Sequence, residues 1–130
     1  MERNKLALIL IRILMGGLFI YHGLFKIFVF TFGGTAQFFE SIGYAGSLAY
    51  IVIFVEIIGG ILLIFGIETR WVSLVLAVEM LFALPAHWAN GFSFTNGGIE
   101  VPFIFFIVLI ALAINDSRGF DVSQEQSIAS

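Results

Sequence analysis

The chain has 130 residues and a net charge of -3; 60% of its residues are hydrophobic and 12% are charged. Soluble domains average roughly 45 to 50% apolar and about 25% charged residues, and a water-soluble fold of this length could not bury so much apolar surface. Its mean hydropathy is +1.07. It has no cysteine, which excludes disulfides, thiolate metal sites and dithiol chemistry. With no basic cluster to mark nucleic-acid binding, the composition indicates an integral membrane protein whose partner is lipid.

The first apolar segment, residues 6–30, is long enough to cross the roughly 30 Å of bilayer hydrocarbon. We expect the glycine pair at residues 33–34 to end it, because paired glycines weaken a helix. The segment that follows, residues 35–46, mixes polar and aromatic side chains. This mixture predicts a short helix in the membrane interface.

Two further spans are predicted at residues 47–67 and 71–89. The turn between them is so short that the two helices must be antiparallel neighbours. Pro85 predicts a kink or an early stop near the end of the second of these spans. A fourth span is predicted at residues 98–115, around a shorter apolar run.

The expected fold is therefore an all-α, integral membrane four-helix bundle that forms one domain over residues 1–130. The basic residues outside the spans fall on one side of this arrangement: Arg3, Lys5, Arg70 and Arg118. Because basic residues collect on the cytoplasmic side of membrane proteins, both termini are expected in the cytoplasm. Residues 116–130 would then form a polar cytoplasmic tail.

Ionisable residues inside the spans are the first candidates for function, because each costs roughly 2.5 to 3.5 kcal/mol in mid-membrane. Arg12, His22 and Lys26 fall within an arc of about 80° on the first helix, so that face must look into the bundle. Glu56 and Glu79 lie near the centres of adjacent antiparallel helices. We expect these two carboxyl groups to contact each other or a shared cation.

His87 and Glu100 are expected near the outer end of the bundle, where they would join His22 and Lys26 in a polar cluster, with Arg12 in the inner half. Two histidines and a carboxylate have the composition of a metal site, but their spacing does not bring them together, and no metal site is predicted.

A purely structural explanation is open for each of these charged residues. Arg12 or Lys26 would pair with one of the two membrane carboxylates and hold the helices in register. If Lys26 does not form such a pair, its side chain would extend its ammonium group to the membrane interface. Glu100 would merely cap the fourth helix.

Four segments resemble those of the DoxX family of small four-helix membrane proteins. Residues 22–26, HGLFK, resemble the family's HGxxK at the end of the first helix. Residues 56–70, EIIGGILLIFGIETR, resemble its strongest stretch, and residues 79–87 resemble its third-helix segment ending in histidine. Residues 97–100, GGIE, resemble the GGxE that opens its last helix. The end of the chain, NDSRGFD at residues 115–121, departs from the family's closing turn.

The resemblance implies a multi-pass protein of the bacterial inner membrane that is associated with redox reactions, since relatives include a subunit of thiosulfate:quinone oxidoreductase. The leading hypothesis is that a polar outer cavity binds a quinone head group. His22 or His87 would donate hydrogen bonds to it, and Glu56 or Glu79 would handle protons.

Two alternatives belong to other functional classes. One is a non-catalytic assembly subunit, working as a homo-oligomer or within a membrane oxidoreductase complex. The other is a proton-coupled carrier of small solutes, in which the two carboxylates would relay protons. The sequence does not decide whether the protein is an enzyme.

Overall fold

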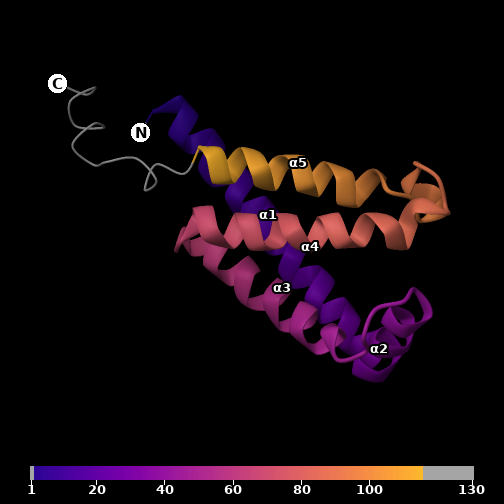
Figure 1. Ribbon diagram of the computed structural model, residues 1–130. Coiled ribbons are helices and arrows are strands. Elements are labelled where there is room, and N and C mark those ends of the chain that lie inside the picture. Colours follow the sequence, from indigo (N-terminus) through magenta and orange to yellow (C-terminus); the bar gives the residue numbers. More distant parts are fainter. Residues whose placement is uncertain (1, 116–130) are drawn as a thin grey trace.

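A computed structural model describes residues 2–115, and these form helices joined by short connections, with no strand among them (Figure 1). The elements in chain order are α1 (Arg3–Phe28), α2 (Thr31–Ser41), α3 (Leu48–Phe65), α4 (Thr69–Trp88), the short 3-10 helix η1 (Phe94–Asn96) and α5 (Glu100–Ile114). α1, α3 and α4 are long and apolar enough to cross a membrane, whereas α5 is a shorter apolar helix. The all-α membrane bundle is thus confirmed. The tail at residues 116–130 lies outside the described residues.

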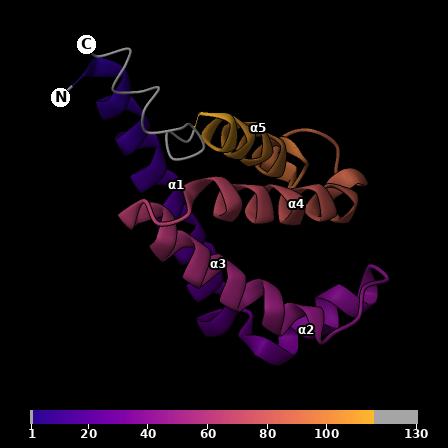
Figure 2. The same ribbon diagram turned by 60° about the vertical axis from the view of Figure 1, so that its left-hand side comes forward.

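The helices are arranged as two pairs that diverge. α1 packs along α3, and α4 packs along α5, with fewer contacts between α3 and α4. Figures 1 and 2 show that the pairs meet near the turn between α3 and α4 and separate toward the end that carries α2 and the loop containing η1. The bundle therefore has a narrow end and a wide end.

Glycine allows α1 and α3 to approach closely. A Cβ atom added to Gly16 would lie 2.5 Å from the carbonyl oxygen of Gly60, and one added to Gly60 would lie equally close to the carbonyl oxygen of Gly16. Gly17 faces open space, and Gly59 instead packs against Leu76 of α4. Small residues at such a contact let backbones approach and gain dispersion energy, which drives helix association in lipid.

The hydrophobic core lies where α1, α3, α4 and α5 meet, toward the narrow end. Its buried members are Met15, Phe19, Leu63, Leu76, Ala77, Met80, Leu109 and Leu112. Many other large apolar side chains are exposed on the outer surface. In water such a surface would promote aggregation, but in contact with lipid it is the expected exterior of a membrane bundle.

The first span ends earlier than predicted, and the glycine pair is not what ends it. α1 stops at Phe28, and Gly33 and Gly34 lie inside α2. The chain turns at Thr31, which adopts a left-handed backbone with φ of 67°, and its hydroxyl accepts a hydrogen bond from the Gly34 N–H at 3.1 Å. The expectation was wrong because this side-chain bond satisfies a free N–H of the first turn and starts a new helix before the glycines.

Pro85 does not stop α4, which continues to Trp88. Proline has no N–H for the carbonyl four residues earlier and weakens the helix at that turn. In this turn the hydroxyl of Tyr44, from the connection between α2 and α3, donates to the Phe82 carbonyl at 2.8 Å. This bond ties the α2–α3 connection to α4 across the wide end of the bundle.

Candidate functional site

The centre of the site is an ion pair between α1 and α3. The Lys26 ammonium nitrogen lies 2.7 Å from Oε1 of Glu56, and only 22% of the lysine side chain and 3% of the glutamate side chain are exposed. Lys26 is in the last turn of α1, whereas Glu56 is in the middle of α3. The lysine therefore turns into the protein, and the bond is a charge-assisted hydrogen bond of the strong kind.

Glu79 of α4 adds a second carboxyl group to this pair. Its carboxyl lies close enough to interact with the Glu56 carboxyl and with the Lys26 ammonium. Its atom Oε1 is nevertheless buried and has no hydrogen-bond partner within residues 2–115. Buried polar atoms are nearly always hydrogen-bonded, so the unpartnered oxygen makes Glu79 a candidate ligand-binding residue.

His22 completes the group from α1, one helical turn before Lys26. Its imidazole is within electrostatic range of both Lys26 and Glu56. The ring packs edge-on against Phe105 of α5, with centroids 5.8 Å apart. We call His22, Lys26, Glu56 and Glu79 the charged cluster.

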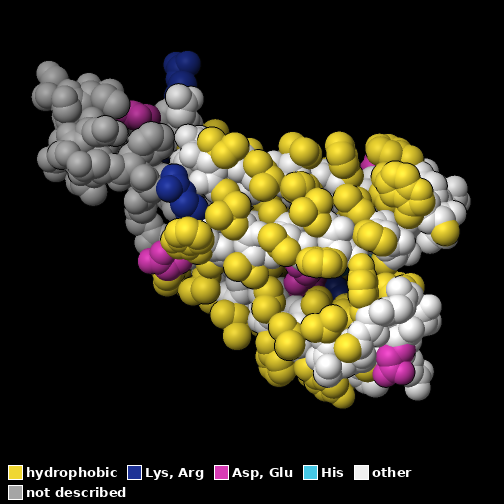
Figure 3. All heavy atoms as spheres, viewed as in Figure 1, with side chains coloured by type: hydrophobic (Ala, Val, Ile, Leu, Met, Phe, Trp, Pro, Cys, Tyr) yellow, Lys and Arg dark blue, Asp and Glu magenta, His cyan; other side chains and the backbone are white. Residues whose placement is uncertain are grey.

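The charged cluster lies on the wide side of the hydrophobic core. Phe19, one turn before His22, is a core residue and also contacts Phe105. In Figure 3, acidic and basic atoms are visible at the bottom of a hollow between α4 and α3, surrounded by hydrophobic side chains. Charges in such an apolar setting interact more strongly than charges in water.

Arg12 lies apart from the charged cluster, near the opposite end of the bundle. Its guanidinium packs against Gly66, which follows the last turn of α3, and a Cβ atom on Gly66 would lie 2.9 Å from Arg12 Cζ. The carbonyl end of a helix carries partial negative charge, which favours a cation there. Arg12 Nε is buried without a hydrogen-bond partner in the described part of the chain. Arg12 therefore faces the bundle as predicted, but it stabilises the end of α3.

His87 and Glu100 do not meet the charged cluster. The His87 ring is 2.9 Å from the Gly97 carbonyl oxygen, and Oε1 of Glu100 accepts a hydrogen bond from the Phe94 N–H at 2.9 Å. Both contacts organise the α4–α5 connection. The predicted outer cluster is thus divided in the structure, and within residues 2–115 no three His, Cys, Asp or Glu side chains are arranged so that they could hold a metal ion.

Phe105 is the site residue that the sequence does not reveal. It lies in an apolar run in which every position resembles its neighbours, and only the packing of α5 against α1 brings it to His22. An aromatic ring beside a histidine offers a flat apolar wall next to a hydrogen-bonding group. Ligand sites of small molecules commonly combine apolar walls of this kind with a few convergent polar groups.

These features define a multi-pass helical membrane protein with a charged group buried among its helices. The DoxX family model matches residues 7–89, so most of α1, all of α2, α3 and α4, and the whole charged cluster lie inside the match. The chain belongs to the DoxX family. It is also 32% identical over 114 residues to the Bacillus subtilis protein named "Putative oxidoreductase CatD", an alignment that covers 88% of this chain and 82% of that protein. No solved structure matches the chain.

Proposed function

We propose that this protein is a redox-associated component of the bacterial cytoplasmic membrane, in which the charged cluster binds the head group of a quinone. The observation that carries the proposal is the buried Glu79 oxygen without a partner, in a carboxyl group that interacts with Lys26 and Glu56, the same two residues that His22 interacts with. The name of the Bacillus subtilis relative supports the link to redox chemistry.

The chemistry of the charged cluster fits both forms of such a ligand. Quinone carbonyl groups accept hydrogen bonds, and the Lys26 ammonium or an N–H of His22 can donate them. Quinol hydroxyl groups donate, and the carboxylates of Glu56 and Glu79 can accept. The flat ring would lie against Phe105, whose ring already contacts His22 at 5.8 Å.

The carboxyl groups would also hold the proton that quinone chemistry needs. Lys26 supplies one positive charge to two neighbouring carboxyl groups, so the cluster is neutral when one of them carries a proton. Glu56 is held by Lys26, which leaves Glu79 as the residue that would carry that proton. Reduction of a quinone consumes two electrons and two protons, and because this chain has no cysteine, the electrons would come from a partner protein in the membrane.

The test is the affinity of a water-soluble, tail-free quinone for the purified protein in lipid nanodiscs, measured for the wild type and Glu79→Leu. Loss of a hydrogen bond to a ligand in an apolar site costs about 1.5 to 3 kcal/mol, which is roughly a 10- to 100-fold increase in Kd. Glu79→Leu should also raise the Tm of the ligand-free protein, because it removes an unpartnered buried oxygen. Unchanged quinone affinity in a folded Glu79→Leu protein would end the proposal.

His87→Ala serves as the matched control. His87 is also an ionisable residue of α4, but its ring contacts the Gly97 carbonyl in the α4–α5 connection. Its replacement should leave the Kd for quinone within a factor of two to three of the wild type. A loss of affinity as large as that of Glu79→Leu would move the binding site to the wide end of α4.

A second candidate function follows from the same pair of carboxyl groups. Two carboxyl groups side by side within the membrane are suited to proton relay, as a proton-coupled carrier requires. Proteoliposomes separate the two functions. Solute-dependent proton uptake that Glu79→Gln abolishes would favour the carrier, whereas quinone binding without any proton flux favours the redox function.

A further inference from the structure

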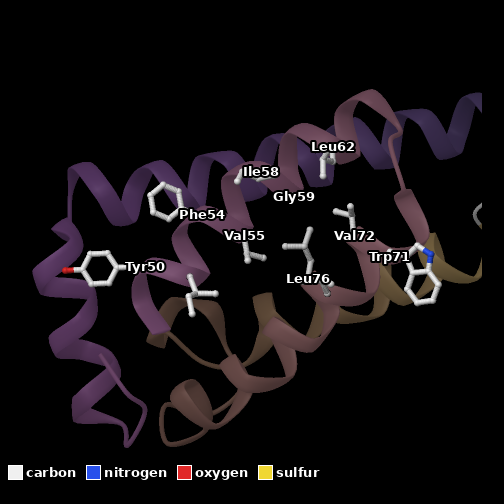
Figure 4. Close-up of a pocket in the computed structure, with 11 residues that line it drawn as sticks. Tyr50, Phe54, Val55, Ile58, Gly59, Leu62, Trp71, Val72 and Leu76 are labelled. Atoms are coloured by element: carbon white, nitrogen blue, oxygen red, sulfur yellow. The ribbon is translucent and has the colours of Figure 1, made fainter. Parts of the chain in front are cut away.

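A long apolar groove runs along the lipid-facing side of the α3–α4 contact. It extends from Tyr50 on α3 to Trp71 on α4, with Val55 and Leu76 between them (Figure 4), and its volume is about 540 Å³. Its eleven lining residues include no acidic, basic or histidine side chain, and the groove is open along its side. A volume of this size is in the range of small-molecule sites, roughly 300 to 1,000 Å³.

The register of the two helices places this groove next to the charged cluster. Gly59 of α3 packs against Leu76 of α4, and because the helices are antiparallel, Val55 is level with the next turn of α4, which carries Glu79. Val75 lines the groove, and Glu79 is four residues later on the same face of α4. The register thus places Glu79 at the level of the groove, one turn of α4 beyond Val75.

The helices also separate at this level. α3 and α4 have far fewer contacts than α1 and α3, and both ribbon views show them diverging beyond the turn that joins them. The open groove on this side of the α3–α4 contact gives a molecule in the bilayer a lateral route to the level of Glu79. Such a molecule would not have to cross the water-facing surface.

We propose that the groove binds the apolar tail of the ligand whose polar head occupies the charged cluster, so that the substrate is a lipid-soluble, long-tailed quinone that enters from the membrane. This inference rests on the proposed function. With the head at Glu79, the tail would run toward Trp71, about 12 Å away along α4. Tyr50 and Phe54 would then border the point where the head enters.

The two tryptophans of the chain allow a direct test, because Trp71 lines the groove and Trp88 does not. In the variant Trp88→Phe, Trp71 is the only tryptophan. A quinone whose saturated tail carries bromine at its far end should quench Trp71 fluorescence and reach saturation at one molecule per protein. In Trp71→Phe, where Trp88 is the only reporter, the same compound should quench no more than brominated phospholipid does.

A blocking variant has a closely matched control. Val75 lines the groove and is 53% exposed, whereas Val78 on the same helix is 50% exposed and does not line it. In the Trp88→Phe background, Val75→Phe should remove most of the saturable quenching, and Val78→Phe should leave it intact. Both valines face lipid, so neither replacement is expected to disturb folding.

The possible results separate this inference from the proposed function. If the tail-free quinone binds but the brominated tail does not quench Trp71, the groove is not the tail site and the head-group site stands. If brominated phospholipid quenches Trp71 to the same extent and Val75→Phe has no selective effect, the groove accepts any lipid and the inference is wrong. If no quinone binds at all, both proposals fail.

Discussion

Lys26 shows why a charged residue near the end of a membrane helix is ambiguous from sequence alone. Its long side chain can reach the interface or turn inward, and both outcomes agree with its position. In the structure it pairs with Glu56 at 2.7 Å, thirty residues away in the chain. The spacing of Arg12, His22 and Lys26 predicts the inward face of α1, but which carboxylate each cation meets depends on helix packing.

Replacing Lys26 by methionine is expected to lower the free energy of unfolding by about 3 to 5 kcal/mol, because it leaves the Glu56 carboxylate buried without its cation. Adding Glu56→Gln to this variant should restore much of the loss, since the buried charge is then gone. Unfolding of the purified protein, followed by circular dichroism, gives the comparison. Lys5→Met, at an exposed position in the first turns of α1, is the control. A Lys26→Met protein as stable as the wild type would show that the ion pair contributes little.

At the scale of helices, the α1–α3 contact depends on a few glycines. α1 and α3 each contain a pair of adjacent glycines, at residues 16–17 and 59–60, but only Gly16 and Gly60 form the close contact between the two helices. Adjacent residues on a helix point about 100° apart, so both members of a pair cannot face the same neighbour. The choice between them is fixed by the rotation of each helix, which is set by the whole interface.

This difference gives a matched prediction within one pair. Gly16→Ala should destabilise the bundle by about 1 to 3 kcal/mol, because the new methyl group would force α1 and α3 apart. Gly17→Ala, which meets nothing within 4 Å, should be neutral or stabilising by up to about 1 kcal/mol, since alanine is the better helix former. Thermal unfolding of both proteins in the same detergent compares them. Equal effects on Tm would contradict the described packing.

The start of α2 illustrates a second limit at this scale. The glycine pair at residues 33–34 is a reasonable helix breaker by intrinsic preference, yet α2 contains it. Thr35 is buried, and its hydroxyl donates to the Thr31 carbonyl at 2.8 Å and lies 3.4 Å from the Lys26 carbonyl oxygen. These hydrogen bonds outweigh the free-energy cost of placing two glycines in a helix. They cannot be predicted from the amino-acid composition of the segment.

At the scale of the whole molecule, long apolar runs predict where the helices α1, α3 and α4 lie, because the bilayer fixes the length of a spanning helix. The apolar runs do not predict that the helices separate into two diverging pairs. This arrangement brings together the four residues of the charged cluster, and it leaves His87 and Glu100 at the α4–α5 connection. Hydrophobicity is nearly uniform around these helices, so it carries little information about which faces meet.

The predicted topology can be tested with single cysteines, because the natural chain has none. Thr95→Cys, in the α4–α5 connection, should react with a membrane-impermeant maleimide added to intact spheroplasts. Glu68→Cys, in the α3–α4 turn, and Asn115→Cys, after α5, should react only once the membrane is opened, as cytoplasmic positions do. If Asn115→Cys is labelled from outside, α5 does not cross the membrane. If Glu68→Cys is labelled from outside, the orientation of the protein is reversed.

The central claim is that the charged cluster holds a small lipid-soluble molecule, and native mass spectrometry of protein extracted gently from its own membrane tests it most directly. Wild-type protein should carry one small molecule per chain, identified as a quinone by organic extraction. Glu79→Leu protein should carry none, and His87→Ala protein should retain it. Wild-type protein that is free of any quinone, and accompanied instead by a stoichiometric partner chain, would contradict the claim and favour a role in assembly.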